Sequence, residues 1–177
     1  PRALSELLHR QVASTAEREV LARGIAASPG AATGYLVFSA TAAQETAARG
    51  ENAILVRRET SPEDIRGMHA AAGVLTERGG MSSHAAVIAR GLGVPCVVGA
   101  EGIVVKGRAR KLVLANGQEL SEGAEVTLDG TSGDVLNGAV ELVEPALDGP
   151  FRTLMNWADQ ARDIDVRANA DTPADAD

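Results

Sequence analysis

The sequence predicts an α/β fold, with one compact domain and a linker helix on each side of it. Three observations lead to this prediction. Seven short apolar runs separated by glycine-containing turns have the character of β-strands. Two segments between these runs have the start and stop signals of helices. With 177 residues and a hydrophobic content of 45%, the chain can bury one substantial core.

The predicted strands begin near residue 25, where the helical pattern gives way to short apolar runs broken by glycine. They cover residues 34–38, 53–56, 73–75, 95–99, 111–117, 125–130 and 134–138. In the sixth of them, Val126 and Leu128 alternate with polar residues, and the turn sequence DGTSGD follows. This pattern predicts a late β-hairpin with one buried side and one solvent-facing side.

Two helices are predicted between the strands. The first covers residues 61–71, where Ser61 is the N-cap and Asp64 stands at the capping-box position that Glu or Gln usually occupies. The second begins at Ser82 or Ser83 and ends at GLGVP, whose glycines provide left-handed caps and whose proline prevents continuation.

The two flanks have helical patterns of their own. Residues 1–22 are predicted to be an N-terminal linker helix, because apolar residues recur at four-residue intervals. Residues 23–144 are predicted to be the central domain. The last part, residues 145–177, contains a proline- and glycine-marked hinge, an amphipathic helix and the beginning of a further strand.

Composition and charge exclude several classes of partner. The net charge is −7, the pI is about 5.0 and the basic residues are scattered, so we expect no nucleic-acid partner. The longest apolar runs are too short to span a membrane, so no membrane partner is expected. Cys96 is the single cysteine, which excludes an internal disulfide framework. A cytoplasmic location is therefore expected.

The candidate functional site is the stretch TERGGMSSHAAVIARGLG, residues 76–93. Its Gly79 and Gly80 form a turn whose backbone can approach a ligand closely. The following helix starts at Ser82, Ser83 and His84, and its unpaired amides and dipole favour an anion. Because a neutral imidazole is a good nucleophile, this arrangement suits a histidine that accepts a phosphoryl group.

Other interpretations of the same residues stay open at this point. A histidine near a helix start is often a cap or a half-buried packing residue, the glycines could serve the turn alone, and Ser82 could serve as an N-cap alone. A metal site is disfavoured, because no cysteine or second histidine lies at ligand spacing and His69 is fifteen positions away. No P-loop motif is present either.

Residues 67–99, GMHAAAGVLTERGGMSSHAAVIARGLGVPCVVG, closely resemble the phosphohistidine domain of the pyruvate, phosphate dikinase family, whose motif is GGMTSHAAVVAR. In the related phosphoenolpyruvate synthases and in enzyme I of the sugar phosphotransferase system, arginine follows the two glycines, so Met81 favours the dikinases. The flanks resemble the same family at residues 24–38, 128–138 and 154–173. The resemblance therefore extends over nearly the whole chain.

This resemblance implies a swivelling β/β/α phosphohistidine domain of a PEP-utilising enzyme. Such an enzyme converts ATP, phosphate and pyruvate into AMP, diphosphate and phosphoenolpyruvate with Mg²⁺. His84 would be the tele-phosphohistidine intermediate, with Gly79, Gly80, Ser82 and Ser83 as the phosphate-supporting loop. It would travel between an ATP-grasp domain and a PEP/pyruvate barrel of the same polypeptide, in a homodimer.

The resemblance also implies roles outside the carrier reaction. Arg167 matches a barrel-strand arginine that grips the substrate's phosphoryl group, and no metal is expected to bind this part of the enzyme. Hinges are expected near Gly24 and at residues 145–150. A regulatory kinase/phosphatase modifies a threonine in relatives where this chain has Ser82, so Ser82 is a candidate for regulatory phosphorylation. The alternatives are the equivalent domain of phosphoenolpyruvate synthase and a non-catalytic interaction module.

Overall fold

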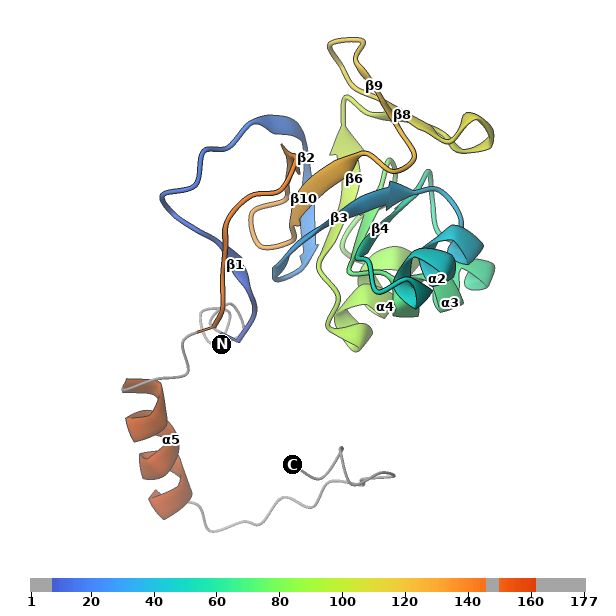
Figure 1. The fold of residues 1–177 in the computed structure, drawn as a ribbon. Helices are drawn as coiled ribbons and strands as arrows, with labels where there is room; N and C mark the ends of the chain where they lie inside the picture. Colours follow the sequence, from blue (N-terminus) through green and yellow to red (C-terminus); the bar gives the residue numbers. More distant parts are fainter. Residues whose placement is uncertain (1–7, 146–149, 162–177) are drawn as a thin grey trace. The chain divides into compact units, whose positions relative to one another are not determined.

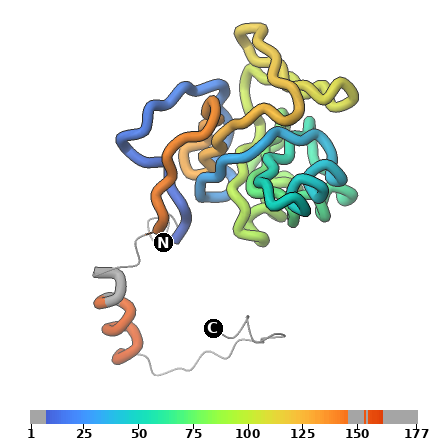
Figure 2. Tube along the Cα trace, in the orientation of Figure 1, coloured from blue at the N-terminus to red at the C-terminus, as the bar shows by residue number. Residues whose placement is uncertain are grey.

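The structure, a computed structural model, describes residues 8–145 and 150–161. The chain divides into two compact units, of which the first ends at Pro145 and the second contains the helix α5 (Pro150–Ala161). Over its described residues, 8–145, the first unit is a closed, mixed β-barrel with three α-helices and two small additional sheets (Figures 1 and 2). The prediction of an α/β fold is therefore confirmed at the level of a mixed α/β barrel.

Seven strands form the barrel. They are β2 (Val20–Ser28), β3 (Ala31–Val37), β4 (Ala53–Arg57), β5 (Gly73–Thr76), β6 (Cys96–Glu101), β10 (Glu125–Asp129) and β11 (Asp134–Asn137). Around the barrel the order is β10-β11-β2-β6-β5-β4-β3, and β3 pairs with β10 to close it. Strands β3, β4, β5 and β6 are parallel neighbours, whereas the other pairs are antiparallel.

Helices connect the parallel strands in a β–α–β pattern and pack on one side of the barrel (Figure 1). They are α2 (Ala40–Ala48), α3 (Ile65–Ala70), which continues a 3₁₀-helix at Pro62–Asp64, and α4 (His84–Leu92). The helices at α3 and α4 were predicted from their capping signals. Helix α2 was not predicted, because its alanine- and threonine-rich sequence has little apolar periodicity.

Alternation along the parallel strands builds two core layers. On β4, Ile54 and Val56 point into the barrel, whereas Leu55 packs against the helices, and all three side chains are fully buried. The helix-side layer consists largely of small residues, including Ala85, Ala86 and Ala89 of α4. Because these side chains are short, α4 lies close to the sheet and its first residue is held near the end of β5.

A partly buried ion pair joins the end of β4 to the start of α3. Arg57 Nε lies 3.1 Å from Asp64 Oδ2, and Arg57 also donates to the carbonyl of Phe38 at 2.9 Å. Asp64 accepts from the backbone N–H of Ser61 at 2.9 Å, which completes the predicted capping box. The side chain of Asp64 is 5% exposed, so its charge is compensated by these donors within the fold.

Two small sheets flank the barrel. One pairs β1 (Gln11–Val12) with β12 (Leu142–Val143), and the other contains β7 (Val104–Lys106), β8 (Lys111–Val113) and β9 (Glu119–Ser121). The three-stranded sheet closes the barrel interior at one end, because Leu112 is fully buried in the same cluster as the barrel core.

The predicted N-terminal linker helix is wrong for residues 8–22. This segment contains β1, a loop and the first residues of β2, and the remainder of the prediction lies outside the described residues. Val12 belongs to β1 and is buried in one cluster with Leu136 rather than placed on a helical stripe. Of the two described residues with the four-residue spacing, Val12 is buried in β1, whereas Leu8 is 50% exposed.

Two further expectations are corrected. Gly24 does not interrupt the chain as a hinge would, because it lies inside β2, where an added Cβ would be 2.8 Å from the carbonyl oxygen of Val98. The late hairpin β10–β11 is confirmed, but its polar side is not solvent-facing: Thr127 and Asp129 are both buried. The Thr127 hydroxyl bonds to Thr33 at 2.7 Å and to the carbonyl of Gly138 at 2.8 Å, so burial leaves it satisfied.

Helix α5 overlaps the amphipathic helix predicted over residues 151–164 and begins one residue earlier, at Pro150, which was predicted to be part of the hinge. The strand predicted after it lies outside the described residues, as does Arg167. Among the described helices, none combines the length and the apolar composition that crossing a membrane requires.

Candidate functional site

The loop between β5 and α4 presents the candidate site. Strand β5 ends at Thr76, whose fully buried hydroxyl donates to the carbonyl of Arg78 at 2.7 Å. The chain then turns through the two glycines, and the N–H of Ser83 donates to the carbonyl of Gly80 at 2.9 Å. These bonds fix both ends of the turn, so α4 begins at a defined place relative to the sheet.

The two glycines of the turn have different roles. Gly79 has φ of 115°, a conformation that side-chain-bearing residues rarely adopt, and an added Cβ would lie 3.0 Å from the Cβ of Ser83. Its carbonyl oxygen packs against Gly99 of β6, where a Cβ would be only 2.5 Å away. Gly80 has open space around its Cα. The turn therefore requires glycine at positions 79 and 99 but not at position 80.

His84 is the first residue of α4 and is exposed. Within the described parts of the chain its imidazole has no hydrogen bond or ion pair, so both ring nitrogens are open to a reactant. The first-turn amides of a helix lack intrahelical acceptors and add a partial positive charge. An anion approaching His84 would therefore meet N–H donors as well as the imidazole.

The two serines before His84 are not equivalent. The Ser83 hydroxyl caps α4 by accepting from the N–H of Ala86 at 3.4 Å. Ser82 is exposed and does not cap the helix. The interpretation of Ser82 as the N-cap is therefore wrong, and its hydroxyl remains accessible.

Side chains at both ends of the loop hold it to the rest of the barrel. From the last turn of α4, Arg90 donates to the carbonyl of Met81 at 2.7 Å and to that of Ala27 in β2 at 3.1 Å. Before the glycines, Glu77 accepts from the N–H of Val105 at 2.8 Å and lies 3.5 Å from Arg58 Nε. The loop is thus connected to β2, to β7 and to the end of β4.

Beneath α4, Cys96 of β6 is fully buried. Burial raises the pKa of this thiol to about 12, and the nearby positive charge of Arg90 opposes the shift only in part. A thiol with so high a pKa is a packing group, since the thiolate is the nucleophilic form.

The described residues do not offer a metal centre. No group of three or more His, Cys, Asp or Glu side chains gathers anywhere in residues 8–145 or 150–161. Mg²⁺ prefers several oxygen ligands in octahedral geometry, and this part of the chain does not supply them.

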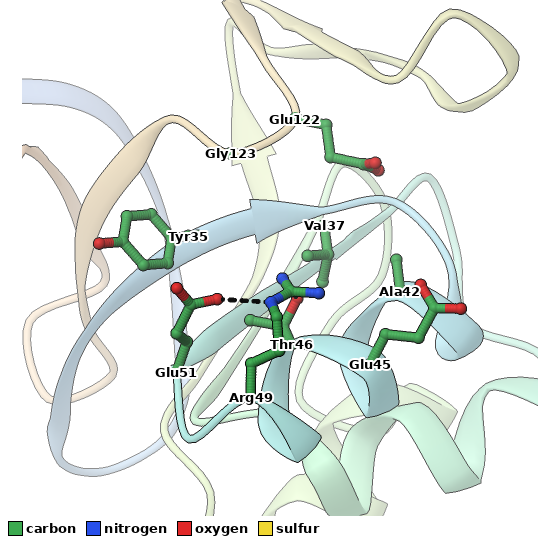
Figure 3. A pocket seen from close by; sticks show the side chains of 9 residues that line it. All are labelled: Tyr35, Val37, Ala42, Glu45, Thr46, Arg49, Glu51, Glu122 and Gly123. Carbon is green, nitrogen blue, oxygen red and sulfur yellow. Dashed lines mark hydrogen bonds and ion pairs between the residues drawn. The ribbon is translucent and has the colours of Figure 1, made fainter.

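Two surface hollows lie away from the loop. One, of about 330 Å³, is lined by residues of β3 and α2 together with Glu122, and the ion pair between Arg49 Nε and Glu51 (2.9 Å) lies within it (Figure 3). The other, of about 560 Å³, includes His9 and lies beside β1 and β12. Neither hollow is lined by His84 or by the glycine turn.

Four of the predicted site residues, together with His84, therefore lie in one continuous loop and helix start: Gly79, Gly80, Ser82 and Ser83. Gly99 and Arg90, which also contact the loop, were not among the predicted site residues. A glycine inside an apolar strand pattern is a known sign of close backbone approach, which could have identified Gly99. Nothing in the sequence pattern indicates that Arg90 reaches back to Met81.

Comparisons with known proteins extend this picture. The model of the PEP-utilising enzyme mobile domain matches residues 49–133. The chain is 52% identical over 176 residues to pyruvate, phosphate dikinase of Rhizobium meliloti (strain 1021). It is 51% and 52% identical over 178 residues to pyruvate, phosphate dikinase 2 of Oryza sativa subsp. japonica and of Zea mays.

Each of these alignments covers 99% of this chain and 20% of the relative. The chain thus spans about a fifth of the length of the curated relatives it matches. Among solved structures, a solution NMR structure of Enzyme I aligns over 62% of this chain and 36% of its own, with 24% identity and a TM-score of 0.34.

Proposed function

We propose that His84 is the phosphohistidine of this chain, which is a homologue of the pyruvate, phosphate dikinases and contains their PEP-utilising enzyme mobile domain. The observation that supports the proposal is the exposed, unpaired imidazole at the start of α4, next to the glycine turn. The homology supports a carrier domain, and the exposure of His84 at the helix start supports it as the group that would carry the phosphoryl.

In the proposed reaction His84 Nε2 is the nucleophile. Its lone pair attacks the β-phosphorus of ATP, the bond between the α–β bridging oxygen and the β-phosphorus breaks, and AMP leaves with the bond's electrons. Inorganic phosphate then takes the outer phosphoryl group as diphosphate. The remaining phosphoryl group passes from Nε2 to the enolate oxygen of pyruvate and gives phosphoenolpyruvate.

This chain would supply the nucleophile and the anion-stabilising surroundings. The amides at the start of α4 and the accessible hydroxyl of Ser82 are donors for the phosphoryl oxygens. The cap formed by Ser83 holds the helix start in place. The described residues provide no magnesium ligand set, so the Mg²⁺ of the proposed reaction would be held outside this part of the chain.

A carrier must reach two different sites, so the proposed function includes a swivelling motion of the β/β/α domain. The partners would be an ATP-grasp domain and a PEP/pyruvate barrel of the same polypeptide, with the hinge at residues 145–150. Arg167 would bind the substrate phosphoryl group in that barrel, and the whole enzyme would be a cytoplasmic homodimer. These proposals rest on homology to proteins about five times longer than this chain.

Regulation at Ser82 forms part of the same proposal. A phosphate on this exposed hydroxyl, two residues before His84, would repel a phosphoryl group arriving at the imidazole. We expect a regulatory kinase/phosphatase to inactivate the enzyme in this way. Phosphopeptide mapping after incubation with ADP and the cognate regulator tests it, and label confined to His84 would refute it.

The experiment for His84 uses the full-length protein and ATP labelled at the β-phosphorus. The wild type should acquire acid-labile, base-stable label, His84→Gln should acquire none, and His69→Gln should be labelled like the wild type. His69 is a suitable control because it is an exposed histidine on α3, away from the loop. Equal labelling of His84→Gln and wild type would refute the proposal.

A second measurement identifies the acceptor. Formation of phosphoenolpyruvate should depend on added inorganic phosphate if the parent enzyme is a dikinase. Formation without added phosphate would instead identify a phosphoenolpyruvate synthase, in which water accepts the outer phosphoryl group.

A further inference from the structure

We propose that Arg90 is a positioning residue that holds the phosphohistidine loop in its reactive conformation. This inference rests on the proposed function of His84 and adds a residue to it. The two hydrogen bonds of the Arg90 side chain go to backbone carbonyls and not to the imidazole of His84. It acts through the carbonyl of Met81, three residues before His84.

The geometry consists of two hydrogen bonds from one guanidinium. Arg90 Nη2 donates to the carbonyl oxygen of Met81 at 2.7 Å, and Nη1 donates to the carbonyl oxygen of Ala27 at 3.1 Å. Ala27 is 2% exposed and belongs to β2 of the closed barrel. The hydrogen bond to its carbonyl therefore anchors the guanidinium of Arg90 to the barrel. The planar guanidinium therefore fixes the distance between the loop and the barrel.

The loop needs such an anchor, because its own sequence does not restrict it. Gly79 and Gly80 add backbone freedom, and Met81 and Ser82 are both exposed. The hydroxyl of Thr76 fixes the chain at Arg78, before the glycines, and Ser83 fixes it after them. Between these points, Arg90 supplies a side-chain hydrogen bond to the loop, at the carbonyl of Met81.

A charged donor makes this contact stronger than an ordinary hydrogen bond. Hydrogen bonds to charged groups typically contribute about twice as much as neutral ones. Arg90 also lies in the last turn of α4, where any cation interacts favourably with the helix dipole. That second effect needs only a positive charge, whereas holding Met81 and Ala27 together needs two donors at fixed geometry.

The test therefore compares Arg90→Lys with Arg90→Met in the full-length protein. Lysine retains the positive charge near the helix end but cannot reproduce the planar two-donor geometry, and methionine retains only the apolar stem. We expect label to enter His84 about 10- to 100-fold more slowly in Arg90→Met at saturating ATP, since small misplacements of a reacting group cost rates of this order. Arg90→Lys should be nearly as slow.

Arg57→Met is the matched control. Arg57 also donates to a carbonyl, that of Phe38, and pairs with Asp64, and neither of these partners belongs to the loop of residues 79–84. This variant should lose thermal stability and still label His84 at the wild-type rate wherever it is folded. A slower rate in Arg57→Met at full folding would mean that any loss of barrel stability affects the site, and it would overturn the assignment to Arg90.

Hydrogen exchange supplies a readout that does not depend on catalysis. Amides at residues 79–84 should exchange faster in Arg90→Met, with exchange in the barrel strands unchanged. Unchanged loop exchange would overturn the positioning role even if the wild type is labelled normally. Conversely, faster loop exchange in a protein that is never labelled on His84 would support the anchor while refuting the proposed function, so the two failures are distinguishable.

Discussion

The glycines near His84 differ in how much space they leave for the Cβ atom that an alanine substitution would add. Gly79 and Gly99 pack against each other. The carbonyl oxygen of Gly79 lies where a side chain at position 99 would have to be. Gly80, next in the chain, faces open space. The conformation of the loop is thus controlled at individual backbone positions rather than by its overall glycine content.

The first prediction compares Gly79→Ala with Gly80→Ala. At Gly79 the φ of 115° and the 3.0 Å approach to Ser83 strain any side chain, at a cost of about 1–3 kcal/mol. We expect Gly79→Ala to slow labelling of His84 at least tenfold and Gly80→Ala to leave it within about twofold. Rates measured on folded full-length protein check this, and equal rates for the two variants would contradict the assignment of separate roles.

The second prediction concerns Cys96 at high pH. Its pKa is raised to about 12 in the folded protein from an ordinary value of 9.0, so the folded state holds the thiol proton more tightly. The stabilisation of the folded state that comes from the buried, protonated thiol of Cys96 is fully present below about pH 9. It is lost as the pH rises toward 12, because the unfolded state then releases the proton first. Folded protein should react very slowly with a thiol reagent near neutral pH.

Unfolding supplies the control for this prediction, because it exposes the same thiol to water. Denatured protein should react at the rate of a free cysteine. Rapid modification of the folded protein, without loss of its structure, would show that Cys96 is more accessible than its full burial under α4 implies.

At the scale of secondary structure, α4 combines the features that make its first residue available. Ser83 has extended backbone angles and caps the helix, Gly93 ends it with φ of 66°, and the alanines of its buried face bring it close to β6. The capping signals that predicted this helix are local, which is why its limits are close to those expected from the sequence.

The third prediction separates the two serines before His84. Ser83→Ala removes the hydroxyl that accepts from Ala86 and should destabilise the domain by about 0.5–1 kcal/mol. Ser82→Ala should have almost no effect on stability, because Ser82 is exposed and does not cap the helix. Chemical denaturation of both variants measures the free energy of unfolding. A larger loss of stability in Ser82→Ala than in Ser83→Ala would contradict the assignment of Ser83 as the N-cap.

At the scale of the whole molecule, the barrel is closed by pairings between distant parts of the chain. β3 pairs with β10, and β2 pairs with both β11 and β6. Every barrel strand lies between Val20 and Asn137, and β12 pairs with β1 just beyond these limits. The unit that ends at Pro145 therefore contains all the partners that its sheets require.

The fourth prediction follows from this closure. A chain that ends at Pro145 should unfold cooperatively with a melting temperature within a few degrees of that of the full chain, because no barrel strand is removed. A chain that ends at Asn137 should be less stable, since it also lacks β12 and therefore the partner of β1. Calorimetry of the three chains checks this, and loss of cooperative unfolding after removal of residues 146–177 would contradict it.

The sequence by itself determined the features that depend on neighbouring residues. These are the short apolar runs that form strands, the capped starts of α3 and α4, the glycine turn and the placement of His84 at a helix start. Only the tertiary structure decided that residues 8–22 form strand and loop, that Thr127 is buried, and that Gly99 and Arg90 hold the loop. The physical reason is the separation along the sequence of the residues that interact. Caps and turns are formed by adjacent residues, whereas burial and long side-chain contacts depend on which distant segments the closed barrel brings together.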